Sequence, residues 1–201
     1  MEPSDIYFSI STHSQDSVRE KASKFLAFAF PIESEDEVRI QLDQLRKKYY
    51  NANHHCYAYR IGHPDSAIYR INDDGEPSGS AGKPIYGQLL SRNLSDLLVV
   101  VVRYFGGTKL GIPGLIKAYR LAASLSLDQS KVIKKVITTQ ICVTFTVSQM
   151  NDVMRMLKQE EVEILSQDYK EQYSVQFLIR KSKRDLIISR LSILANISIY
   201  E

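Results

Sequence analysis

A run of six apolar residues, Leu97–Val102 (LLVVVV), constrains the fold of this chain more than any other segment. A strand with one face in water alternates apolar and polar residues, whereas a strand covered on both faces is apolar throughout. We therefore expect a buried strand that is covered on both faces.

The segments around this run predict further regular elements. Strands are expected at Ile6–Ile10, Lys24–Ile32, His54–Ile61 and Ala67–Ile71, and helices after the N-cap Ser34, from Pro84 to about Asn93, and from about Pro113 to Ser126. From about Val136 the pattern changes to strand 136–147, helix 149–159, strands 161–169 and 173–180, helix 183–194 and strand 196–200. The order β-α-β-β-α-β is the ferredoxin-like arrangement. We predict an α+β protein of two domains, residues 1–130 and 136–201.

Composition is that of a globular protein, with 201 residues, 44% hydrophobic and 24% charged. The net charge of +3 arises entirely after residue 130 and is too small to indicate a polyanionic partner by itself. No apolar run reaches 18 residues, and Met1–Asp5 does not resemble a secretory signal. Cys56 and Cys142 lie far apart, so no disulfide framework is expected. We expect a cytoplasmic protein.

Two glycine-rich loops, Asp73–Pro84 and Arg103–Gly114, each follow a strand and lead into a helix with proline near its start. Free N–H groups at a helix N-terminus attract anions, and glycines let a phosphate approach the backbone. Lys83, Arg103 and Lys109 add positive charge beside these loops. One interpretation is that the glycines only turn the chain. The other is that the two helix N-termini frame one anion-binding region.

Known phosphate and metal motifs do not fit these segments. Pro77 stands where Walker A needs its first glycine, and Pro84 where it needs Ser or Thr. In the predicted strand, His54 and Cys56 share one face and His55 takes the other. Two ligands are too few for a closed zinc site. We expect no metal and no cofactor.

Three segments together resemble the YigZ/IMPACT family: His54–Ile61, Asp73–Pro84 and Val101–Gly111. Their order, spacing and residues match the family's motifs. Two positions depart from its pattern, because Pro113 replaces a glycine and Lys117 an arginine. The proline removes one N–H donor, and the lysine lacks the bidentate geometry of arginine.

The resemblance implies an N-terminal β-α-β domain similar to domain IV of elongation factor G and to certain ribosomal proteins, a two-layer α/β sandwich. It implies a ferredoxin-like C-terminal domain similar to domain V of that factor. Both relatives work on RNA in the ribosome, and eukaryotic members are linked to translational control under amino-acid starvation. The function implied is a nucleic-acid or ribosome-associated binding protein that regulates translation, with RNA or the ribosome as partner and no membrane.

Two other functions stay open: a regulator of translation that acts through protein interactions, and an enzyme on a phosphorylated or nucleotide substrate. We lean against an enzyme and assign no catalytic residue. The predicted nucleic-acid or anion-binding residues are Lys83, Arg103, Tyr104, Gly106, Gly107, Lys109, Lys117 and Arg120, with Tyr104 available for base stacking. A candidate functional loop comprises His54, His55, Asp73, Asp74, Gly75, Glu76, Ser78, Gly79 and Gly82. For the enzyme alternative, the residues to test are His54, Asp73, Glu76 and Ser78.

Overall fold

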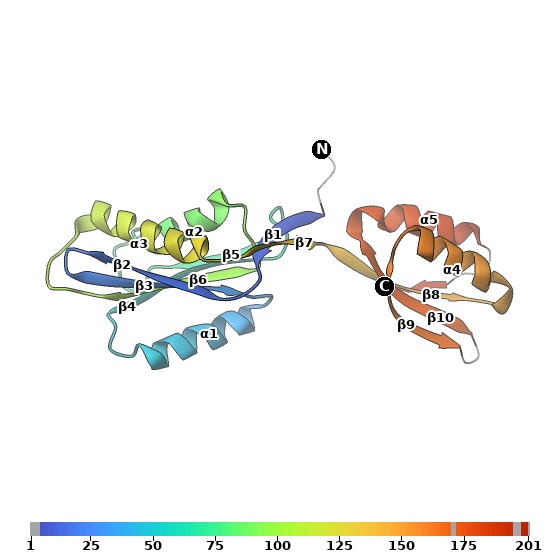
Figure 1. Ribbon diagram of the computed structural model, residues 1–201, viewed down its shortest axis with the longest axis horizontal. Helices are drawn as coiled ribbons and strands as arrows, with labels where there is room; N and C mark the ends of the chain where they lie inside the picture. Colours follow the sequence, from blue (N-terminus) through green and yellow to red (C-terminus); the bar gives the residue numbers. More distant parts are fainter. Residues whose placement is uncertain (1–4, 170–171, 195–197, 201) are drawn as a thin grey trace. The chain divides into compact units, whose positions relative to one another are not determined.

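The computed structural model describes residues 5–169, 172–194 and 198–200 (Figure 1). The chain divides into two compact units, one over Tyr7–Lys135 and the other from Val136 onward together with Asp5 and Ile6. In chain order the elements are β1 (Ile6–Ile10), β2 (Ser14–Glu20), β3 (Ser23–Pro31), α1 (Glu35–Lys48), β4 (His54–Ile61), β5 (Ile68–Asn72), α2 (Gly82–Ser91), β6 (Leu97–Tyr104), α3 (Gly111–Asp128), β7 (Val132–Val136), β8 (Thr138–Phe145), α4 (Met150–Gln159), β9 (Glu163–Tyr169), β10 (Tyr173–Arg180), α5 (Arg184–Ile193) and β11 (Ser198–Tyr200). None of the helices in the described ranges is long and apolar enough to cross a membrane.

A five-stranded antiparallel sheet in the order β2-β3-β6-β4-β5 forms the centre of the first unit. The central strand β6 pairs on both sides, so that Val100 lies opposite Phe28 of β3 and Tyr57 of β4. Every residue of β6 from Leu97 to Arg103 is buried. The expectation of a strand covered on both faces is confirmed.

The two faces of this sheet belong to two separate cores. Val99 and Val101 face the core that α2 and α3 complete, whereas Val100 and Val102 face the core that α1 completes. Figure 1 shows α1 on one side of the sheet and α2 with α3 on the other. The unit therefore has three layers, and the two-layer sandwich implied by the family resemblance is wrong. Both faces of the central strands are apolar, and each face needs its own cover.

Helix α1 begins at its predicted N-cap. The Ser34 hydroxyl accepts a hydrogen bond from Glu37 N at 3.3 Å, which satisfies one free donor of the first turn. The Glu37 carboxylate accepts from Glu33 N at 3.0 Å, one residue before the N-cap. The apolar side of the helix then packs on the sheet through Val38, Leu42 and Leu45.

A tight hairpin between β2 and β3 positions the loop that follows β6. Its two turn residues, Lys21 and Ala22, both have positive φ, a combination that type I′ hairpin turns require. The turn lies so close to Gly106 that a Cβ there would overlap the backbone carbonyl of Ala22. Glycine at this position lets the loop after β6 pass against the hairpin.

The second unit has the predicted ferredoxin-like order. Its four strands form an antiparallel sheet in the order β11-β8-β10-β9, which is 4-1-3-2 by position in the chain. Helices α4 and α5 bury Val153 and Ile187 against Ile141 and Phe177 of the sheet. The sequence predicted one strand from 136 to 147, whereas the structure ends β7 at Val136 and begins β8 at Thr138. Strands β7 and β1 pair as a separate two-stranded sheet.

Candidate functional site

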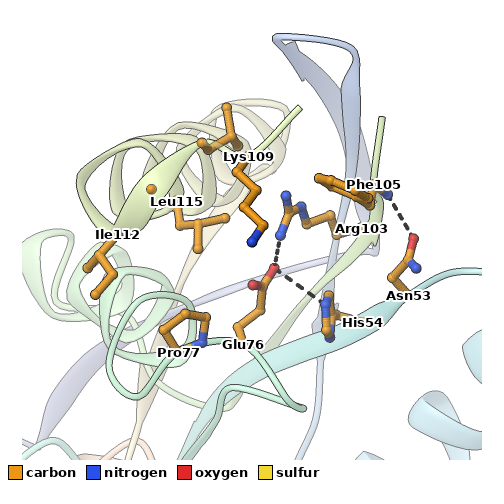
Figure 2. A pocket seen from close by; sticks show the side chains of 11 residues that line it. Asn53, His54, Glu76, Pro77, Arg103, Phe105, Lys109, Ile112 and Leu115 are labelled. Atoms are coloured by element: carbon orange, nitrogen blue, oxygen red, sulfur yellow. Dashed lines mark hydrogen bonds and ion pairs between the residues drawn. The ribbon is translucent and has the colours of Figure 1, made fainter. Parts of the chain in front are cut away.

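The two glycine loops meet at a cleft of about 430 Å³ in the first unit (Figure 2). His54 of β4 and Arg103 of β6 lie directly opposite each other on paired strands. Glu76 comes from the first glycine loop, and Lys109 comes from the second loop, just before α3. The sheet therefore brings together residues from three segments that are distant in the sequence.

A buried ion pair forms one wall of this cleft. Arg103 Nη1 lies 2.5 Å from Glu76 Oε1, and the two side chains are only 6% and 4% exposed. The hydroxyl of Tyr119 donates a second hydrogen bond to the same oxygen at 2.7 Å. The guanidinium lies over the rings of Phe25 and Phe105, at 5.4 and 5.5 Å from their centroids. Because a buried charge needs its partner, neither member of this pair can be removed without a large cost in stability.

His54 presents one ring nitrogen to the cleft. Its Nδ1 lies 2.7 Å from the carbonyl oxygen of Asp74, which can only accept, so Nδ1 carries the proton. In the neutral ring Nε2 is then an acceptor, and it lies 3.9 Å from Glu76 Oε1. The side chain is 23% exposed, so that a bound molecule can reach it.

Cys56, which shares the face of His54, is a core residue. Its sulfur lies 3.0 Å from the Asp73 carbonyl oxygen and 3.3 Å from the Tyr119 hydroxyl. Burial raises the pKa of the Cys56 thiol well above its usual value, and burial also raises the pKa of Tyr119. The thiol is therefore protonated near neutral pH and is not a nucleophile.

The N-terminus of α2 is filled by the chain itself. The Asp73 carboxylate accepts hydrogen bonds from Gly79 N at 2.8 Å, Ala81 N at 3.0 Å and Gly82 N at 2.8 Å. These donors include the first N–H groups of the helix, which an external anion would otherwise use. The interpretation that two open helix N-termini frame one anion site is therefore corrected to one, that of α3.

The N-terminus of α3 opens on the cleft. Its N-cap residue is Leu110, which makes no capping hydrogen bond through its side chain. Gly111 and Ile112, the first two helical residues, line the cleft together with Lys109. Pro113, the third helical residue, has no N–H to offer. An 18-residue helix carries partial positive charge at this end, and the exposed Lys109 adds a full charge.

The other predicted anion-binding residues lie outside the lining of the cleft. Gly106 and Gly107 are exposed in the loop between Arg103 and Lys109, and Lys83, Lys117 and Arg120 are exposed on α2 and α3. Tyr104 packs with the core beneath α1, and its hydroxyl donates to Asn51 Oδ1 at 3.0 Å.

Most residues of the candidate functional loop make contacts within the protein and do not line the cleft. The Asp74 carboxylate accepts from His55 N at 2.6 Å, and Gly75 lies against the His54 ring. His55 lies on the opposite face of β4, where burial lowers its pKa and its buried Nε2 has no hydrogen-bond partner among the described residues. Of the four residues named for the enzyme alternative, His54 and Glu76 line the cleft, while Asp73 is committed to backbone donors and Ser78 is exposed outside the lining.

Sequence reasoning missed several lining residues. Asn53 accepts from Phe105 N at 2.8 Å and so joins the start of β4 to the second loop. Phe105 and Ile112, 43% and 54% exposed, form apolar parts of the lining. No spacing rule connects these positions, and an exposed apolar residue in a loop is the sole signal that could have indicated them.

Comparisons with protein-family models and with known proteins both point to the IMPACT family. The model of the Impact N-terminal domain family matches residues 21–127. The IMPACT family member YvyE of Bacillus subtilis is 39% identical over 129 residues, which are 64% of this chain and 59% of that protein. The IMPACT family member YigZ of Escherichia coli is 33% identical over 150 residues, 74% of each chain. A crystal structure described as a hypothetical protein superposes with a TM-score of 0.72 at 26% identity and covers 96% of both chains.

Proposed function

Since this chain belongs to the IMPACT family, we propose that it is an RNA- or ribosome-associated binding protein that acts in the regulation of translation. The family resemblance supports this role, because it links eukaryotic members of the family to translational control. A protein partner in the translation machinery is compatible with the same role.

The observation that carries the proposal is the open N-terminus of α3 beside Lys109. Backbone N–H groups and the helix dipole favour a phosphate at this end of the helix. Lys117 and Arg120 are exposed further along α3 and are the proposed additional contacts to an RNA backbone. Arg103 is not a simple surface contact, because its guanidinium is buried against Glu76.

The test is a titration of the protein with labelled single-stranded RNA across a salt series, beside Lys109→Ala and the control Lys47→Ala. Lys47 is exposed on α1, which covers the opposite face of the sheet. Each phosphate contact contributes about −0.7 to the slope of log affinity against log salt for a single strand. We expect Lys109→Ala to weaken binding and reduce the slope by about that amount, while Lys47→Ala behaves like the wild type.

Absence of RNA binding at low salt, or an unchanged slope in Lys109→Ala, would contradict the proposal. Such a result would favour the second candidate, a regulator that binds a protein. The specific observation for that candidate is strand β5, which lies at the edge of the sheet next to β4. Its residues Ile68 and Tyr69 are both 59% exposed, and unpaired apolar strand edges are places where another chain can add a strand.

A further inference from the structure

We propose that the cleft takes one ribonucleotide, with its phosphate at the N-terminus of α3 and its ribose hydroxyls at Glu76 and His54. The ribonucleotide is either free or an unstacked nucleotide of an RNA strand. This inference rests on the proposed function, because it uses the same phosphate contact, and adds a residue-level reason for choosing RNA over DNA.

The phosphate end of the cleft has two independent features. One is the uncapped N-terminus of α3 with Lys109 beside it. The other is Arg103, which is 5% exposed, lines the cleft, and has a buried Nε with no hydrogen-bond partner among the described residues. Because Nε is buried and Nη1 and Nη2 donate to Glu76 and Ser23, Arg103 acts at this wall through the position and charge of its guanidinium and not through a free N–H donor.

Beside Arg103, the cleft also offers acceptors. Glu76 Oε1 is saturated by Arg103 and Tyr119, whereas Oε2 accepts no hydrogen bond within the described part of the chain. Figure 2 shows the Glu76 carboxylate and the His54 ring facing the same space. In the neutral ring His54 Nε2 is also an acceptor, because Nδ1 donates to the Asp74 carbonyl.

The 2′- and 3′-hydroxyls of ribose each have one proton to donate, and together they fit this pair of acceptors. Carboxylates bind ribose hydroxyls in nucleotide sites, and the 2′-hydroxyl is the group by which proteins distinguish RNA from DNA. Deoxyribose lacks the 2′-hydroxyl and would leave one of these acceptors unpaired in a partly dry site, which is unfavourable.

The remaining space and charge fit a single nucleotide. A volume of about 430 Å³ falls within the range of small-ligand pockets, and Phe105 and Ile112 offer apolar surface for a base. Glu76 and Arg103 neutralise one another, so Lys109 and the helix dipole supply the net positive charge. That charge matches one phosphate group better than a triphosphate.

The experiment compares the affinity of the full chain for labelled single-stranded RNA and for DNA of the same sequence. Ribonucleoside and 2′-deoxyribonucleoside 5′-monophosphates are added as competitors. We expect RNA to bind about tenfold more tightly than DNA, a difference of the size that one lost polar contact produces. Competition by the free ribonucleotides would assign the site to free nucleotides. If the free nucleotides fail to compete with bound RNA, the site takes a nucleotide within a strand.

The matched variants are His54→Ala and Lys109→Ala. His54→Ala should bring the RNA-to-DNA affinity ratio toward one, whereas Lys109→Ala should weaken both ligands and preserve the ratio. We avoid Glu76 substitutions because they break the buried ion pair. Thermal unfolding of His54→Ala and Lys109→Ala checks that both variants are folded. Equal binding of RNA and DNA by the wild type, or an unchanged ratio in His54→Ala, would overturn the ribose assignment alone. Absence of binding to any nucleic acid would overturn the proposed function as well.

Discussion

Gly106 acts through the side chain that it lacks. The loop after β6 passes against the turn of the β2–β3 hairpin, and any Cβ at Gly106 would overlap the backbone of Ala22. Backbone atoms cannot swing away as a flexible side chain can, so the hairpin or the loop would have to shift. Since the same loop continues to Phe105 and Lys109, Gly106 contributes to the shape of the cleft.

We predict that Gly106→Ala lowers the free energy of unfolding by about 1–3 kcal/mol, the usual cost of overpacking. The control is Gly87→Ala in α2, where an added Cβ meets nothing within 4 Å. That change should raise stability by up to about 1 kcal/mol, because alanine is the better helix former. Urea denaturation of both variants measures the effects. If Gly106→Ala is as stable as Gly87→Ala, the β2–β3 hairpin shifts away from the added Cβ without loss of stability.

Single residues of the site were only partly predictable. His54, Glu76, Arg103 and Lys109 could be selected because glycine loops and charged residues are visible in the sequence. That Glu76 and Arg103 neutralise one another could not be predicted, because Glu76 lies in the first glycine loop and Arg103 on β6, and the fold brings them together. The role of Asp73 as an internal cap was hidden for the same reason.

Asp96 ties three secondary-structure elements together at the start of β6. Its carboxylate accepts hydrogen bonds from Tyr7 of β1 at 2.6 Å, from Lys135 of β7 at 2.7 Å and from Gly62 N, just after β4, at 2.8 Å. Burial by itself would raise the pKa of Asp96, but the hydrogen bonds from Lys135, Tyr7 and Gly62 outweigh burial and hold the pKa below its usual value. The ends of these elements are thus fixed by one charged group.

We predict that Asp96→Asn lowers the free energy of unfolding by about 2–4 kcal/mol at pH 7. The folded pKa of Asp96 is depressed, so its contribution is present above the unfolded value of about 4 and is lost as pH falls through the folded pKa. The difference between the wild type and the variant should therefore shrink as the pH is lowered from 7 to below about 4. Urea midpoints of both proteins measured across this pH range test the prediction. A stability difference that stays constant with pH would show that the charge of Asp96 does not contribute.

Elements were predictable where their own residues determine them. Strands β1 and β4 lie at the predicted bounds Ile6–Ile10 and His54–Ile61 because their apolar patterns are local. Strand β2 was missed, since its sequence SQDSVRE is polar and its edge position depends on pairing with β3. The turn at Lys21 and Ala22 has no glycine or asparagine to indicate it, although both residues have positive φ.

For the whole molecule, each of the two units has a core of its own. The ferredoxin-like order of the second unit could be read from the sequence, because its strands and helices follow one another as contiguous patterns. The third layer of the first unit could not be read from the family resemblance. It follows instead from the apolar character of both faces of β6, which the run Leu97–Val102 already indicated.

Separate cores predict separate losses of stability. Phe177 is fully buried in the core of the second unit, and Phe28 is 6% exposed in the core beneath α1 of the first. Truncation of a buried phenylalanine costs about 3–5 kcal/mol. We expect Phe177→Ala to accelerate amide hydrogen exchange mainly in β8, β10, α4 and α5, and Phe28→Ala to accelerate it mainly in β3, β6 and α1. Mass spectrometry of peptides from the intact chain measures both patterns. Equal acceleration in both units by either variant would mean that the two cores unfold as one cooperative body.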